Sequence, residues 1–165
     1  MHVLIADDDP VYQSLLSGLL SEWRFQITTA GDGLEAWEAI QRDPTIRLAI
    51  LDWLMPGMDG FQVCTKARNQ GPNEDLYILI VTGSSTRDDI MKVVVAGADD
   101  YLIKPFQPFD LKIRLRNAIR ILQLQEEAAA LRHAFRRQAS GEEMRQMRTG
   151  EPAQLRLLQP VRREA

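Results

Sequence analysis

Residues 48–60 read LAILDWLMPGMDG, an apolar run that ends in one acid, Asp52, ahead of a loop rich in proline and glycine. The apolar part predicts a buried strand, yet burial disfavours a lone carboxylate. Polar residues also follow two other apolar runs, VLIA at 3–6 and YILIV at 77–81, namely Asp7, Asp8 and Asp9 after the first and Thr82 and Gly83 after the second. Three predicted strands therefore deliver polar groups at their ends.

Short apolar runs alternate with longer helical patterns along the chain. They predict strands at 2–6, 25–30, 47–52, 77–82 and 100–103, with a helix after each. Five such units predict an α/β fold, a three-layer αβα sandwich with a five-stranded parallel sheet and an elongated C-terminal helix. We expect the flavodoxin-like strand order 2-1-3-4-5, in which the first and third strands flank the crevice where ligands bind. Asp7, Asp8 and Asp52 should meet there.

Hydrophobic periodicity also predicts which helical residues face the sheet. We expect buried faces at Val11, Leu15, Leu16, Leu19 and Leu20 in the first helix, at Leu34, Ala36, Trp37 and Ile40 in the second, and at Ile90, Val93, Val94 and Ala96 in the fourth.

Length and composition indicate one domain with an appendage, since 165 residues with 45% apolar side chains can build a sizeable core. The net charge of −3 conceals an asymmetry, with −7 over residues 1–131 and +4 over residues 132–165. An acidic body argues against nucleic-acid binding, so no direct DNA binding is predicted. The basic tail is either simply solvated or contacts acidic partners.

A single cysteine, Cys64, cannot form an internal disulfide and indicates a reducing compartment. No apolar stretch approaches the roughly 18 residues that span a bilayer, and the N-terminus enters a strand directly instead of a signal peptide. A cytoplasmic protein without membrane contact is expected.

The last helix begins near Pro108 and meets no clear stop before Ser140 and Gly141. We expect a domain at 1–122, a helical extension and possible coiled coil at 123–149, and a loosely ordered basic tail at 150–165. A second apolar stripe of this helix runs from the end of the domain into the extension with 3,4,3,4 spacing, and it consists of Ile121, Leu124, Ala128, Leu131 and Phe135. Such spacing favours a homodimer through this helix, although the stripe is short and a folded-back helix is the alternative.

Three carboxylates in one crevice repel one another, and a divalent cation would keep them ionised. Hard oxygen ligands favour Mg²⁺, with Mn²⁺ as a substitute. A carboxylate beside that ion can attack phosphorus and form an aspartyl phosphate if donors receive the phosphoryl oxygens. Three residues supply such donors: the Thr82 hydroxyl, the unobstructed backbone of Gly83 and the ammonium of Lys104, which directly follows the fifth strand.

The constellation resembles the response-regulator receiver domain of two-component signalling. The match covers residues 1 to about 122 and rests on four motifs in order, LIADDD at 4–9, LDWLMPGMDG at 51–60, VTG at 81–83 and DYLIKPF at 100–106. Together they are highly specific. The resemblance implies a phosphoprotein that receives a phosphoryl group from a histidine kinase or phosphotransfer protein and then switches its interactions with a partner.

The resemblance also implies a role for each motif residue. Asp52 would be the phosphoacceptor, Asp8 a direct metal ligand, Asp7 a ligand mainly through bound water, the Leu54 carbonyl a further ligand, Lys104 the phosphoryl contact, and Thr82 and Tyr101 the switch pair. A cis Lys104–Pro105 bond is also implied. Gly83 stands where alanine is frequent, and apolar Leu54 occupies a position that often influences dephosphorylation, so the phosphate lifetime stays open.

Two rival functions remain in view. An aspartyl phosphatase needs a second acid two residues after its nucleophile, and Leu54 stands there. An adaptor that works without phosphorylation would keep the fold without needing the acids and Lys104. No output motif follows the receiver-like region, so the effector is either a separate protein or a domain absent from this chain.

Overall fold

The computed structural model describes residues 1–73, 75–83 and 86–149. Its five strands are β1 (His2–Ala6), β2 (Gln26–Ala30), β3 (Ile46–Asp52), β4 (Tyr77–Thr82) and β5 (Asp100–Ile103). They form one parallel sheet in the order β2-β1-β3-β4-β5. The predicted α/β fold and strand order are confirmed, and each strand lies within one residue of its expected bounds.

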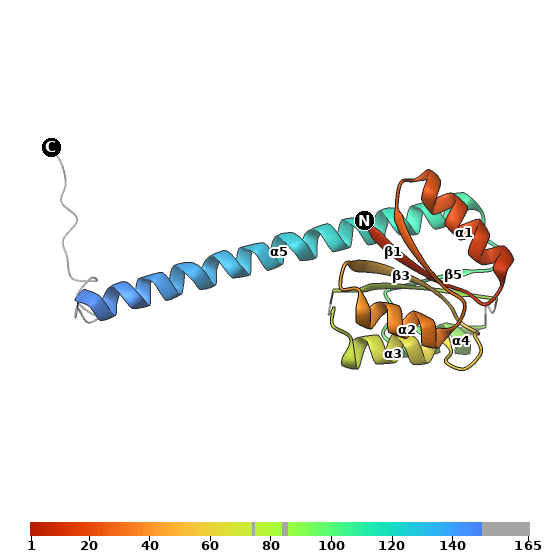
Figure 1. The fold of residues 1–165 in the computed structure, drawn as a ribbon, viewed down its shortest axis with the longest axis horizontal. Helices are drawn as coiled ribbons and strands as arrows, with labels where there is room; N and C mark the ends of the chain where they lie inside the picture. Colours follow the sequence, from red (N-terminus) through yellow and green to blue (C-terminus); the bar gives the residue numbers. More distant parts are fainter. Residues whose placement is uncertain (74, 84–85, 150–165) are drawn as a thin grey trace. The chain divides into compact units, whose positions relative to one another are not determined.

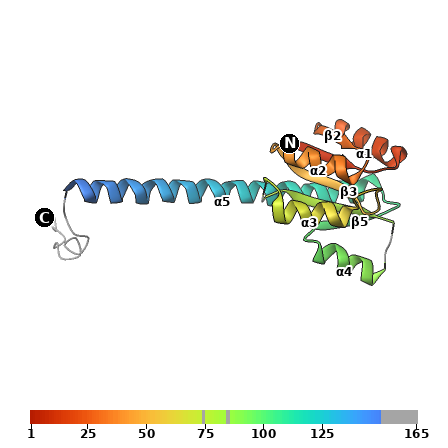
Figure 2. The same cartoon turned by 60° about the horizontal axis from the view of Figure 1, so that its bottom comes forward.

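Helices cover both faces of the sheet (Figures 1 and 2). The bounds are α1 (Pro10–Glu22), α2 (Gly33–Arg42), α3 (Gly60–Gln70), α4 (Arg87–Val95) and α5 (Pro108–Thr149). One core cluster joins the sheet to α2, α3 and α4, and the other joins it to α1 and the first turns of α5. Burial on both faces explains why β1, β3 and β4 are almost continuously apolar.

Acids and a hydroxyl begin the helices by accepting hydrogen bonds from free backbone amides. Asp9 caps α1, Asp32 caps α2 and Thr86 caps α4. Asp59 forms a capping box with Gln62 at the start of α3. These residues end the loops that follow β1, β2, β3 and β4, so capping also fixes where those loops enter the helices.

Several apolar helix residues that we expected to be buried are exposed. The wrong predictions concern Val11 and Leu15 in α1, Leu34 in α2 and Val94 in α4, whereas Leu16, Leu20 and Val93 are buried. Adjacent helical positions are 100° apart, so Leu15 points well away from Leu16 even though both are leucine. The sheet covers a narrower part of each helix surface than the hydrophobic periodicity suggested.

Helix α5 continues through Ser140 and Gly141, the first stop signals in its sequence, and ends at Thr149. One glycine costs a helix only about 1 kcal/mol, and no proline lies between Pro108 and Pro152. By contact density the chain divides into two units, Met1–Leu122 and Gln123–Ala165. The predicted loosely ordered tail at 150–165 lies outside the described residues. Within the described part, no helix is both long and apolar enough to cross a membrane.

Candidate phosphoacceptor and metal site

The register of the sheet brings four chemically active residues to one edge. Ala6 pairs with Leu51, Asp52 with Val81, and Thr82 with Ile103. Asp7 and Lys104 therefore begin the loops beside the last residues of β3 and β4. Parallel strands all present their carboxyl ends at the same edge, which is why sequence positions this far apart can share a site.

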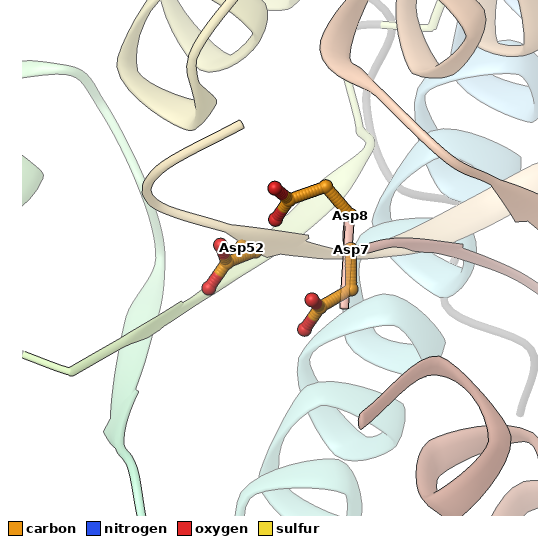
Figure 3. Close-up of side chains that lie close together, drawn as sticks. All are labelled: Asp7, Asp8 and Asp52. Atoms are coloured by element: carbon orange, nitrogen blue, oxygen red, sulfur yellow. The ribbon is translucent and has the colours of Figure 1, made fainter. Parts of the chain in front are cut away.

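Three carboxylates converge there, as predicted. One oxygen each from Asp7, Asp8 and Asp52 lies within 4.8 Å of the other two (Figure 3). Asp7 and Asp52 are buried, whereas Asp8 is exposed. The Asp9 amide donates a hydrogen bond to Asp7 Oδ1 at 2.9 Å, which orients that carboxylate. The cluster has buried negative charge on one side and an open approach at Asp8.

Lys104 supplies the positive charge of the site. Its Nζ lies 2.8 Å from Asp7 Oδ2 and 2.8 Å from Asp52 Oδ1. Burial raises the pKa of Asp52, and Lys104 opposes that shift only in part. Burial alone would lower the pKa of Lys104, but its hydrogen bonds and charge contacts with Asp52 and Asp7 raise it overall. One ammonium thus faces two buried carboxylates, and a third carboxylate lies beside them.

This donor set fits a hard divalent cation. Carboxylate oxygens are the ligands that Mg²⁺ prefers, and a site with one or two carboxylates leaves room for water and phosphate oxygens. The exposed carboxylate of Asp8 and the buried carboxylates of Asp7 and Asp52 could hold such an ion. No histidine or cysteine belongs to this cluster, so its chemistry does not suit zinc.

The loop after β3 turns tightly back on Asp52. The Trp53 amide donates to the Val81 carbonyl at 2.8 Å, and the Gly60 amide donates to the Trp53 carbonyl at 2.9 Å. A Cβ atom at Gly60 would lie 2.3 Å from the Asp52 carbonyl oxygen, so only glycine fits there. The Leu54 side chain is exposed beside this turn. A carbonyl role for Leu54 stays a prediction.

Thr82, Gly83 and Tyr101 lie where the sequence placed them. Thr82 is buried at the end of β4, and the Lys104 amide donates to its carbonyl at 2.7 Å. Gly83 is exposed, and a Cβ atom there would meet nothing within 4 Å. Tyr101 is half-buried against the core, with the Arg114 guanidinium 5.7 Å from its ring. The Lys104–Pro105 bond is cis, as the resemblance implied.

Tyr12 is a site residue that the sequence analysis missed. Its ring centroid lies 4.1 Å from Lys104 Nζ and 6.1 Å from the ring of Phe106, so it covers the ammonium from the side of α1. An ammonium over an aromatic face is attracted by the ring quadrupole. The available signal was its position four residues after Asp8, within the first turn of a helix that begins at the site.

Comparison with known proteins agrees with this geometry. Residues 3–116 match the family described as response regulator receiver domain. Response regulator MprA of Mycobacterium ulcerans is 37% identical over 130 residues, which cover 79% of this chain and 55% of that protein. The two-component response regulator ORR5 of Oryza sativa subsp. japonica is 30% identical over 110 residues, covering 67% of this chain and 82% of that protein.

Solved structures share the fold. Chemotaxis protein CheY4 of Vibrio cholerae matches with a TM-score of 0.66 and 29% identity, covering 71% of this chain and 97% of that one. The receiver domain of sensor histidine kinase PA1611 from Pseudomonas aeruginosa, with a magnesium ion coordinated in its active site cleft, matches with a TM-score of 0.66 and 25% identity, covering 74% and 97%. The chain spans 55% to 58% of the MprA proteins it matches.

Proposed function

Because the chain belongs to the response regulator receiver family, we propose that Asp52 is its phosphoacceptor and that phosphorylation switches its contacts with other proteins. A receiver domain is a signalling phosphoacceptor and not a classical enzyme. The observation that carries the proposal is the position of the Asp52 carboxylate, which lies 2.8 Å from Lys104 Nζ and forms one cluster with Asp7 and Asp8.

In the proposed transfer, an Asp52 oxygen attacks phosphorus while the bond from phosphorus to a histidine nitrogen of the donor breaks. The phosphoryl group gains a P–O bond to Asp52, and the P–N electron pair stays with the histidine. The Lys104 ammonium already contacts Asp52, so it would also be close enough to contact an oxygen of the phosphoryl group. Asp7, Asp8, Asp52 and the Leu54 carbonyl would hold Mg²⁺, or Mn²⁺ as a substitute. The ion would offset the negative charge of the carboxylates and of the phosphoryl group.

Thr82 and Tyr101 are the proposed switch pair. The Thr82 hydroxyl and the Gly83 amide would contact the phosphoryl group, and movement of Thr82 would open space for the Tyr101 ring. Slow hydrolysis of the acyl phosphate would reset the protein. The exposed, apolar Leu54 offers no acid or base to an attacking water, which favours a long-lived phosphorylated state.

The proposed partners follow from this cycle. A histidine kinase or phosphotransfer protein would donate the phosphoryl group, and a separate effector or a further domain would read the result. We also propose a homodimer through the exposed stripe of α5, with no direct DNA binding by the receiver. The unpaired, buried Cys64 supports work in the reducing cytoplasm.

The test is incubation with acetyl phosphate and Mg²⁺, followed by intact-mass measurement. One added phosphoryl group is expected, none on Asp52→Asn, and wild-type behaviour for Asp75→Asn, which changes an acid remote from the cluster in sequence. Unmodified wild-type mass, or modification of Asp52→Asn, contradicts the assignment. Rapid multiple turnover of the phosphodonor would instead indicate the aspartyl phosphatase. Partner affinity that ignores phosphorylation would indicate the adaptor.

A further inference from the structure

The extension part of α5 carries an apolar stripe with no cover in the described chain. Leu124, Leu131 and Phe135 are exposed by 56%, 63% and 72%. With Ala128 between them, the spacing is 4,3,4, so all four lie along one side of the helix. Apolar residues at this spacing gain most when a second helix with the same spacing covers them.

Charged residues flank the stripe on opposite sides. In heptad terms Leu124 and Leu131 occupy d positions and Ala128 and Phe135 occupy a positions, which places Glu127 at g and Arg132 at e. Arg132 Nε donates to the Ala128 carbonyl at 3.3 Å, so the guanidinium lies back along the helix beside the smallest residue of the stripe. Among residues whose side chains are described, Glu127 and Arg132 form no ion pair within the chain.

We propose that residues 124–138 pair with a second copy of this chain as a parallel, in-register coiled coil in which Glu127 contacts Arg132 of the partner subunit. This inference rests on the dimer proposed above and specifies its orientation and register. In a parallel pair, a g residue meets the e residue five positions later on the other helix. Glu127 and Arg132 have that separation, so two-fold symmetry creates two opposite-charge pairs beside one buried stripe.

An antiparallel pair would not satisfy these charges. Its flanking contacts join g to g and e to e. Glu127 would then face position 127 or 134, a glutamate or an alanine, and Arg132 would face position 132 or 125, an arginine or a glutamine. None of these contacts joins opposite charges, and two of them repel. Charge complementarity therefore selects the parallel orientation, which places the amino ends of both extension helices together.

Charge reversal tests the pairing. Sedimentation velocity over a concentration series should show Glu127→Arg and Arg132→Glu each dimerising about fivefold to tenfold more weakly than wild type, because two attractive pairs become two repulsive ones. The double variant should recover near-wild-type dimerisation. Glu126→Arg is the matched control, since position f points away from the partner and should leave dimerisation unchanged. A double variant no better than either single variant overturns the proposed pair.

Disulfide trapping tests the orientation. The native Cys64 should not crosslink in this experiment, because it is buried and burial raises its pKa to about 11. Leu124→Cys and Phe135→Cys should each form a disulfide with their own copy under mild oxidation. These positions are 11 residues, about 16 Å, apart along the helix, so an antiparallel pair cannot place both opposite themselves. If a mixture of the two variants forms a disulfide between position 124 of one chain and position 135 of the other, the parallel register is overturned.

The outcomes separate this inference from the phosphoacceptor proposal. Every variant above should take up one phosphoryl group from acetyl phosphate, because the changes lie outside the receiver. Wild-type protein that is phosphorylated but monomeric at all concentrations overturns the dimer and the register together and leaves the role of Asp52 standing. Protein that dimerises in parallel without accepting phosphate overturns only the role of Asp52.

Discussion

The amino and carboxyl ends of the sheet each bury a polar side chain, but the groups that surround this side chain differ between the two ends. His2 begins β1 and Asp52 ends β3, and both are 7% exposed. The His2 ring nitrogens lie 3.0 Å from Thr45 Oγ1 and 2.8 Å from Thr28 Oγ1. Asp52 instead shares one ammonium with Asp7 and has Asp8 beside it. At the amino end, two hydroxyls and the carboxylate of Asp43, whose Oδ2 lies 3.2 Å from His2 Nδ1, complete the contacts of the ring, whereas like charges gather at the carboxyl end.

The contrast distinguishes burial that serves stability from burial that serves chemistry. A buried polar group normally finds partners within the protein, as His2 does. A cluster of carboxylates in which the pKa of one member is raised is expected where a bound ligand completes the charge balance. The amino end should therefore respond to mutation by changing stability, and the carboxyl end by changing reactivity.

The largest expected effect is on reactivity. Lys104→Met removes the charge that faces both Asp7 and Asp52, and we expect phosphorylation by acetyl phosphate to slow by about a hundredfold. Lys92→Met, which removes an exposed lysine paired with Asp89, is the control and should react at the wild-type rate. Equal rates in all three proteins would show that Lys104 does not assist transfer.

The next effect is on stability at the other end. His2→Leu leaves the hydroxyls of Thr28 and Thr45 without their ring partner, and urea unfolding should show a loss of about 1–3 kcal/mol. The phosphorylation rate of the folded variant should not change. A variant as stable as wild type would mean that the two hydroxyls find other partners at little cost.

A smaller effect is expected at Tyr12. Tyr12→Leu removes the ring that lies 4.1 Å from Lys104 Nζ, and the phosphorylation rate should fall about threefold. Tyr12→Phe keeps the ring and should react as wild type does. If the phenylalanine variant is as slow as the leucine variant, the hydroxyl and not the ring is responsible.

The smallest effect is a pH dependence of opposite sign at the two ends. Because the pKa of Asp52 is raised, its charged form opposes folding, so Asp52→Asn in Mg²⁺-free buffer should be more stable than wild type at pH 7. This advantage should shrink as pH falls through the raised pKa and vanish below the ordinary value of 3.8. Urea midpoints across this range provide the measurement.

Asp43, at the amino end, is the control. Hydrogen bonds from the Thr45 hydroxyl and amide lower the pKa of Asp43. Its charged form therefore favours folding above the ordinary pKa, and that contribution is lost as pH falls through the lowered value. Asp43→Asn should be less stable than wild type at pH 7, with the difference fading in acid. If Asp52→Asn and Asp43→Asn changed stability in the same direction at pH 7, the contrast between the two ends would be removed.

Much of the site followed from sequence because parallel strands end at one edge. Asp7, Asp8, Asp52 and Lys104 each follow or end an apolar run, so their convergence needed only the strand order. Tyr12 was missed because a tyrosine in the first turn of a helix resembles an ordinary surface residue. Val11 and Leu15 were misjudged because periodicity shows which residues are apolar but not how wide the covering surface is.

The sequence by itself determined the element types, their order and the strand ends that carry chemistry, because periodicity and capping depend on neighbouring residues. Only the tertiary structure decided that Asp52 is buried while Asp8 is exposed, and that Lys104 reaches Asp7 across 97 positions. Burial and ion pairing depend on what other elements bring within a few ångströms. Local sequence does not contain that information, since strand pairing and helix packing join distant segments.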